Sequence, residues 1–138
     1  MSKSFSLVLA LGASLLVGSP ALAEPVQDGS KAAKEWLALV DAGKYGQSWE
    51  QAARFFKKNV TKEQWEQAAR QVRGMTGAFV SRKLRSAVLT KELPGAPAGQ
   101  YVVIQFDASF KNKKGAVETI TVMLEADKKW RAAGYFIK

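Results

Sequence analysis

The sequence predicts an α+β domain, in which three N-terminal helices pack on a curved antiparallel sheet of four strands. Two observations lead to this class. Up to about residue 77, apolar residues recur at the spacing of a helical face; beyond it they alternate, or run in short blocks between turn residues. Helices followed by consecutive strands with short connections are typical of α+β proteins, and the simplest pairing of such strands is a meander.

The first residues have the pattern of a secretory signal peptide. Lys3 precedes an apolar stretch at 5–17, and an Ala-Leu-Ala motif ends at Ala23. The stretch is shorter than the roughly 20 residues that a membrane-spanning helix needs. We therefore expect cleavage after Ala23, export to the periplasm or the medium, and a mature chain that does not span the membrane. An uncleaved N-terminal anchor is the alternative.

The rest of the chain divides into a short polar leader and one domain. Residues 24–30 are expected to be flexible, because they are polar and lie next to a new terminus. Residues 31–138 then form a single α+β domain, of a size that buries one core.

Three helices are predicted, at about 31–42, from Tyr45 to about 56, and from about 62 to 74. Gly43 follows the first, where a left-handed residue often ends a helix. Thr61 and Gln64 have the spacing of a capping box, which marks the start of the third. The apolar faces of the three helices are Ala33, Trp36, Leu37 and Val40; Trp49, Ala52, Ala53 and Phe56; and Trp65, Ala68, Ala69 and Val72.

The hexapeptide WEQAAR occurs twice, at 49–54 and at 65–70. Each copy presents a tryptophan and two alanines to one side, while its Glu and Arg are spaced to pair on the flank. A duplicated functional site would need its polar residues to converge, whereas these point away from the apolar face. We interpret the repeat as one packing solution used twice, to dock two consecutive helices on the sheet.

Four strands are predicted after residue 77, at 79–93, 100–110, 116–125 and 130–137. The second has the clearest alternation of apolar and polar residues. The segment PGAPAG at 94–99 must be a loop, and Gly134 would let the last strand bend.

The composition excludes several kinds of chemistry. The chain has no cysteine and no histidine. Thiol nucleophiles, thiolate or imidazole metal ligands, and Ser-His or Cys-His catalytic arrangements are therefore impossible. The acidic residues are few and scattered, so we expect neither a metal nor a cofactor.

The formal net charge of +9 favours polyanionic partners, or simply keeps a small protein in solution. The candidate anion-contacting residues are Arg82, Lys83, Arg85, Lys111, Lys113 and Lys114. Lysine-rich turns at 111–114 and 128–129 flank one strand and should lie at opposite ends of the sheet, with no interleaved aromatic residues. Nucleic acid is therefore not expected as a partner.

The tryptophans and two carboxylates are the remaining candidate site residues. A ligand pocket between helices and sheet would be lined by Trp36, Trp49, Trp65, Ile104, Phe106 and Trp130. The alternative is that these residues form the core. Asp107 is either a general base or a surface charge. Glu118 is either partly buried or a residue of the sheet rim.

Several stretches resemble one family in particular. They are WLALVDAGKYGQSW, KEQW, YVVIQFDASFKNKKGAVETITVMLE and the final WRAAGYFIK. The chain from Ala32 to Lys138 resembles the bacterial domain-of-unknown-function family DUF4019. The resemblance implies a small exported domain without an established activity. The order of helices and curved sheet is also similar to the cystatin-like and nuclear-transport-factor-like folds.

These observations lead to one expected function and two alternatives. We expect a non-enzymatic module of the bacterial envelope that binds a small apolar or amphipathic molecule, or a protein, in a helix–sheet groove or on the second sheet face. That face would also suit a homodimer. One alternative is a basic accessory module that associates with anionic envelope polymers. The other is a small hydrolase or isomerase that uses Asp107.

Overall fold

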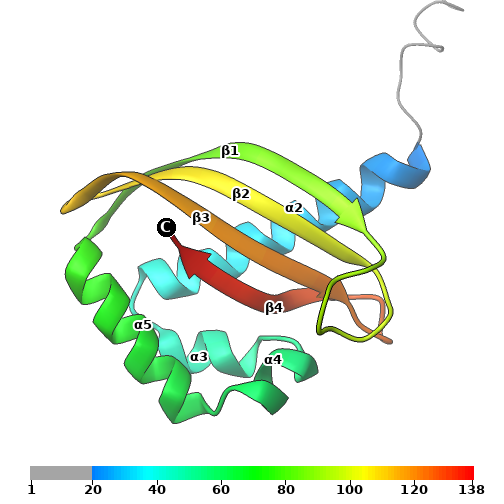
Figure 1. Ribbon diagram of the computed structural model, residues 1–138, viewed down its shortest axis with the longest axis horizontal. Helices are drawn as coiled ribbons and strands as arrows, with labels where there is room; N and C mark the ends of the chain where they lie inside the picture. The colour runs from blue at the N-terminus through cyan, green and yellow to red at the C-terminus, as the bar shows by residue number, and fades with distance from the viewer. Residues whose placement is uncertain (1–19) are drawn as a thin grey trace, which may run out of the picture.

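The computed structural model describes residues 20–138, in which four helices precede a four-stranded antiparallel sheet (Figure 1). The α+β class is confirmed, whereas the expected count of three helices is wrong. The predicted signal peptide falls almost entirely outside the described residues and stays a prediction. The elements are α2 (Pro20–Asp41), α3 (Tyr45–Glu50), α4 (Arg54–Asn59), α5 (Lys62–Thr76), β1 (Phe79–Thr90), β2 (Tyr101–Phe110), β3 (Lys113–Leu124) and β4 (Trp130–Ile137).

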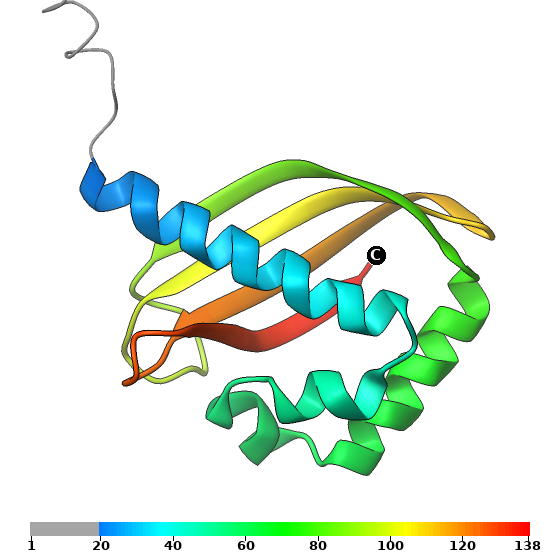
Figure 2. The same ribbon diagram turned by 180° about the vertical axis from the view of Figure 1, so that it is seen from behind.

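The sheet is a meander in the order β1-β2-β3-β4, as the sequence predicts. Helix α2 crosses one face, here called the inner face, while α3, α4 and α5 lie beyond the β4 edge (Figures 1 and 2). Each strand pair contains a register shift, including one between Leu84 and Ser86 and one beside Gly134. Such bulges bend strands and strengthen their twist, which explains the curvature of the sheet.

The core lies between α2 and the inner face. Alternate residues of β2 and β3 point to this side, so that Val102, Ile104 and Ile120 are fully buried. They meet Leu37 and the other apolar residues that the sequence predicts for the first helix. On the outer face, Tyr101 is covered as well, since its hydroxyl group donates a hydrogen bond to the carbonyl oxygen of Pro97 in the 91–100 loop.

Helix α2 begins at Pro20 rather than near Lys31, and this differs from the expected flexible leader at 24–30. Gly29 is buried against the sheet, and a Cβ atom there would lie 2.9 Å from Cγ2 of Val102. The missing side chain lets the helix approach the strands closely. The polar composition of the leader conceals this packing, because only one side of the helix meets the sheet.

The second predicted helix is divided into α3 and α4 at Gln51–Ala53. There the backbone N–H of Ala53 donates a hydrogen bond to the carbonyl oxygen of Ala132 in β4, at 2.8 Å. The first WEQAAR copy therefore spans a break that docks on β4, while the second lies within the continuous helix α5. The expectation that both copies form helices docked on the sheet is met in full by neither: the first copy meets β4 but is interrupted, and the second is helical but packs mainly against α3.

Candidate functional site

The central tryptophans fill the space between helices and sheet. The rings of Trp36 and Trp65 lie 5.5 Å apart, and Phe56 and Tyr135 pack edge-on against both. The indole N–H of Trp36 donates to the backbone oxygen of Ser48 at 2.8 Å, and that of Trp65 donates to the Ser48 hydroxyl at 2.9 Å. Ser48 itself is fully buried, so these bonds satisfy polar groups that would otherwise destabilise the core.

The other predicted pocket residues are not gathered around one cavity. Ile104 and Phe106 are buried beneath the tryptophans. Trp49 is half-buried at the far side of α3, where its N–H donates to the backbone oxygen of Val60 at 2.7 Å. Trp130 lies at the start of β4, beside an open polar hollow. Four of the six residues belong to the buried core, as the alternative interpretation expects, and Trp49 and Trp130 are partly buried residues packed against it.

An apolar groove of about 190 Å³ lies instead between α5 and the C-terminal half of β4. Helix α5 packs mainly against α3 and not closely on β4, which leaves this space. The side chains of Val72 and Phe136 at the groove are 36% and 57% exposed. The lining residues are Val40, Trp65, Ala68, Ala69, Val72, Arg73, Tyr135, Phe136 and Ile137.

The sequence of α5 explains the shape of its wall. The predicted capping box is confirmed: the Gln64 backbone N–H donates to the Thr61 hydroxyl at 3.1 Å, and the Thr61 N–H donates to the Gln64 side chain at 2.9 Å. Because α5 begins at this cap, its Trp65 and Ala69 face the core. Ala68 lies at the groove with a small side chain, so the wall stays recessed.

A buried cluster of charged residues lies at the inner end of the groove. We call it the ionic cluster: Asp41 from α2, Arg73 from α5, Arg82 from β1, Glu118 from β3 and Tyr135 from β4. Arg73 donates to Asp41 at 2.9 Å and to the Tyr135 hydroxyl at 3.1 Å. Arg82 donates to Asp41 at 2.9 and 3.1 Å and to Glu118 at 2.6 and 3.1 Å. The guanidinium groups also stack on phenylalanine rings, Arg73 on Phe110 and Arg82 on Phe79.

Two positive and two negative charges balance each other in this cluster. Glu118 is fully buried, so the interpretation of this residue as a rim residue is wrong. Burial opposes the charge of Arg82, but its hydrogen bonds to Asp41 and Glu118 outweigh that effect and raise its pKa. Burial and the negative charge of Glu118 raise the pKa of Tyr135. Its hydroxyl group therefore stays protonated and donates to Glu118 at 2.5 Å.

A family model described as a protein of unknown function, DUF4019, matches residues 32–135. The chain belongs to this family. The match begins in α2 and ends in β4, so it includes the whole ionic cluster and most of the groove. No curated protein matches the chain. The family description states no activity for this DUF4019 domain.

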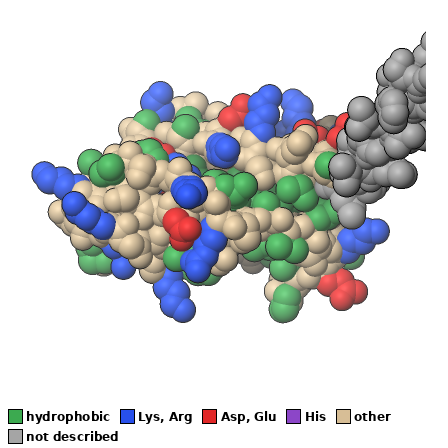
Figure 3. Space-filling model, turned by 90° about the horizontal axis from the view of Figure 1, so that it is seen from above, with side chains coloured by type: hydrophobic (Ala, Val, Ile, Leu, Met, Phe, Trp, Pro, Cys, Tyr) green, Lys and Arg blue, Asp and Glu red, His purple; other side chains and the backbone are tan. Residues whose placement is uncertain are grey.

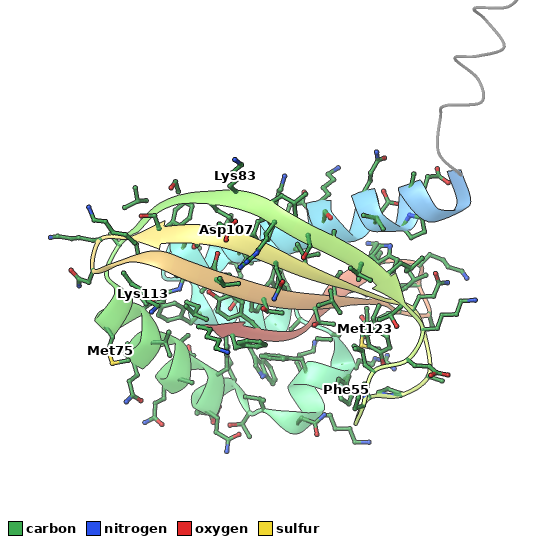
Figure 4. The ribbon with its side chains drawn as sticks, turned by 45° about the horizontal axis from the view of Figure 1, so that its top comes forward. Phe55, Met75, Lys83, Asp107, Lys113 and Met123 are labelled. Atoms are coloured by element: carbon green, nitrogen blue, oxygen red, sulfur yellow. The ribbon has the colours of Figure 1, made fainter. Side chains whose placement is uncertain are left out.

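The catalytic candidate Asp107 lies on the outer face of β2 (Figure 4). Its side chain is 57% exposed, and it forms an ion pair with Arg85 at 3.6 Å. A general base usually owes its altered pKa to burial or to a specific charged neighbour in a cleft. The open, solvated surroundings of Asp107 match its alternative interpretation, a surface charge.

The candidate anion-contacting residues are divided among three places in the DUF4019 domain. Arg82 points into the ionic cluster, whereas Lys83 and Arg85 are exposed on β1. Lys111, Lys113 and Lys114 lie at the β2–β3 hairpin, and Figure 4 shows Lys113 apart from Lys83. Lys and Arg side chains are likewise spread across the face seen from above (Figure 3). The structure does not bring the six residues together.

Two further findings concern residues 20–138 alone. No group of three or more acidic side chains there is placed to hold a metal ion. None of the helices described is both long and apolar enough to cross a membrane.

Sequence reasoning did not find Asp41, Arg73 or Tyr135 as members of the ionic cluster. One signal was present for Arg73, since the spacing Trp65, Ala69, Arg73 continues the inward face of α5. A charged residue on an apolar helical face indicates a buried partner. The partners themselves come from three other elements, and no local pattern links them.

Proposed function

We propose that this DUF4019 domain is a non-enzymatic, exported binding module that takes one apolar group of its partner into the groove between α5 and β4. The observation that carries the proposal is the apolar groove itself, with exposed Val72 and Phe136 beside it. Exposed apolar side chains that adjoin a concave surface commonly mark an interaction site.

The size of the groove limits what it accepts. Small-molecule sites usually have volumes of about 300–1,000 Å³. A cavity of about 150 Å³ holds a benzene-sized group. The groove, at about 190 Å³, therefore matches one aromatic ring or one branched alkyl group of an amphipathic molecule or a protein.

The side chains at the groove support binding rather than catalysis. Among the described residues that line it there is no carboxylate, and Arg73 alone is charged. The terminal nitrogens of Arg73 are already bonded to Asp41, Glu118 and Tyr135. The groove thus offers apolar contact and a rigid floor, without a free acid or base among the described residues that line it.

A groove-filling variant tests the proposal. We expect the apolar dye 8-anilinonaphthalene-1-sulfonate to bind the folded protein with enhanced emission, and small alkyl or aryl alcohols to displace it. Ala68→Phe places a ring in the groove and should weaken dye binding by about tenfold, the loss expected when one well-buried apolar contact is removed.

The matched control is Gln67→Phe, which adds the same ring at an exposed position of α5 outside the groove. This variant should bind the dye as the parent does. Equal binding by both variants, or no binding by the parent protein, would refute the proposal.

A further inference from the structure

We propose that the occupant of the groove is an extended peptide segment of a partner protein, bound as an additional strand along the free edge of β4. The inference rests on the proposed binding role of the groove and specifies its partner. In this mode main-chain hydrogen bonds supply affinity, and pockets for alternate side chains supply specificity.

The hydrogen-bond pattern of β4 leaves its C-terminal half available. Val117 and Lys138 exchange both backbone hydrogen bonds, at 3.0 and 2.9 Å. In an antiparallel ladder, bonded and non-bonded pairs alternate, so Ile137 and Tyr135, opposite Glu118 and Ile120, direct their backbone groups away from β3. Among the described residues, the backbone hydrogen bond that this edge receives from the helical region lies earlier in the strand, where the N–H of Ala53 bonds the carbonyl oxygen of Ala132.

The two edges of the sheet differ in how they resist strand addition. Edge strands are commonly protected by bulges and by charged side chains. The β1 edge has both, with two register shifts and the exposed basic residues Lys83 and Arg85. The β4 segment from Ala132 to Ile137 contains no charged residue, and its bulge lies before Tyr135. The last residues of β4, from Tyr135 to Ile137, are therefore the better template for pairing with an added strand.

The groove lies where inward side chains of an added strand would enter. Neighbouring strands lie about 4.8 Å apart, and every second side chain points to the same face. Inward side chains of the added strand would follow those of Tyr135 and Ile137 and enter the space beside α5. One of them fills a groove of about 190 Å³. Outward side chains would pair with Phe136, which is otherwise largely exposed.

Charge indicates which peptide fits. A second hollow continues the groove and is lined by Val72, Met75, Thr76, Asn112, Lys113, Ile137 and Lys138. No acidic side chain lines either hollow in the described part of the chain. Two copies of a chain with a net charge of +9 would repel each other, whereas an acidic peptide is attracted. The partner segment thus carries an apolar anchor residue flanked by Asp or Glu.

Selection from a displayed library of random peptides, each about ten residues long to match a strand, tests this inference. We expect enriched sequences with apolar residues at every second position and acidic residues beside them. Alternate backbone amides of a selected peptide form two sets, of which only one faces β4. N-methylation of that set should weaken binding by about tenfold, and N-methylation of the other set should change it little. A helical spacing of apolar residues, or no enrichment, would overturn the inference.

A pair of variants at Ile137 separates main-chain from side-chain binding. Ile137→Pro removes the outward N–H without removing a bond to β3, and Ile137→Ala removes most of the side chain but keeps the N–H. The proline variant should bind the selected peptide far more weakly than the alanine variant, with both proteins still folded in a thermal melt. Equal binding by the two variants would overturn strand addition.

The outcomes distinguish this inference from the proposed function. If Ala68→Phe abolishes dye binding while the N-methylated peptides bind as their parents do, the groove binds ligands and strand addition is wrong. If Ala68→Phe alters neither dye nor peptide binding, the proposed function fails. A peptide-free dimer that Ile137→Pro dissociates would identify a second copy as the occupant and overturn the inference.

Discussion

At the scale of single residues, the sequence predicts what depends on near neighbours. Thr61 and Gln64 form their capping box because both partners lie within one helical turn. Glu118 had two open interpretations, because its burial depends on Arg73 and Arg82 from other elements. Its full burial follows from the ionic cluster, and the cluster appears only when α5, β1 and β3 are assembled.

The charge of Glu118 is expected to be necessary for stability. Glu118→Gln would leave two buried arginines with Asp41 as their only anion in the ionic cluster. Removing one partner from a buried ion pair typically costs about 3–5 kcal/mol of unfolding free energy. Asp107→Asn is the control, because its exposed pair with Arg85 should change stability by less than about 1 kcal/mol. Urea unfolding of both variants measures the difference, and similar losses would contradict this assignment.

At the scale of elements, the WEQAAR repeat shows that a local sequence pattern alone does not determine where a helix is interrupted. Two identical hexapeptides have the same helix propensity, yet one is interrupted and the other is continuous. Contact with β4 decides the difference, since tertiary packing commonly overrides propensity. The predicted flank pairing also changes, because Glu50 bonds Lys62 rather than Arg54. The bounds of the strands agree better with the prediction than those of the helices. Apolar and polar residues alternate along a strand when one face of its sheet is covered, so the sequence pattern itself marks the strand.

Both copies nevertheless bury their second alanine, which predicts a common response to mutation at that position. Ala53 is fully buried and Ala69 nearly so, whereas Gln51 and Gln67 are exposed. Ala53→Glu and Ala69→Glu would each bury an unpaired carboxylate, and we expect either variant to unfold the domain. Gln51→Ala and Gln67→Ala should change stability by less than about 0.5 kcal/mol. A thermal melt that ranks all four variants alike would refute this interpretation of the repeat.

At the scale of the whole molecule, the fold class was predictable and the groove was not. The groove exists because α5 packs on α3 and stands away from β4, and this placement depends on contacts distant in sequence. The predicted tryptophan pocket failed to form for a related reason. Ser48 accepts hydrogen bonds from both Trp36 and Trp65 and thereby draws their rings together.

The distribution of charge over the whole molecule predicts how it meets polyanions. In the described part of the chain, basic residues occupy β1 and both ends of the sheet, so they form no continuous track there. We expect weak retention on immobilised heparin that is lost by about 0.15 M salt, where screening is effective beyond about 8 Å. Replacing Lys113 and Lys114 by Ala should reduce retention only in part, as should replacing Lys128 and Lys129. Loss of retention in one of these double variants alone would instead indicate a localised anion site and favour the accessory-module alternative, whereas retention that persists unchanged at high salt would count against a purely electrostatic association.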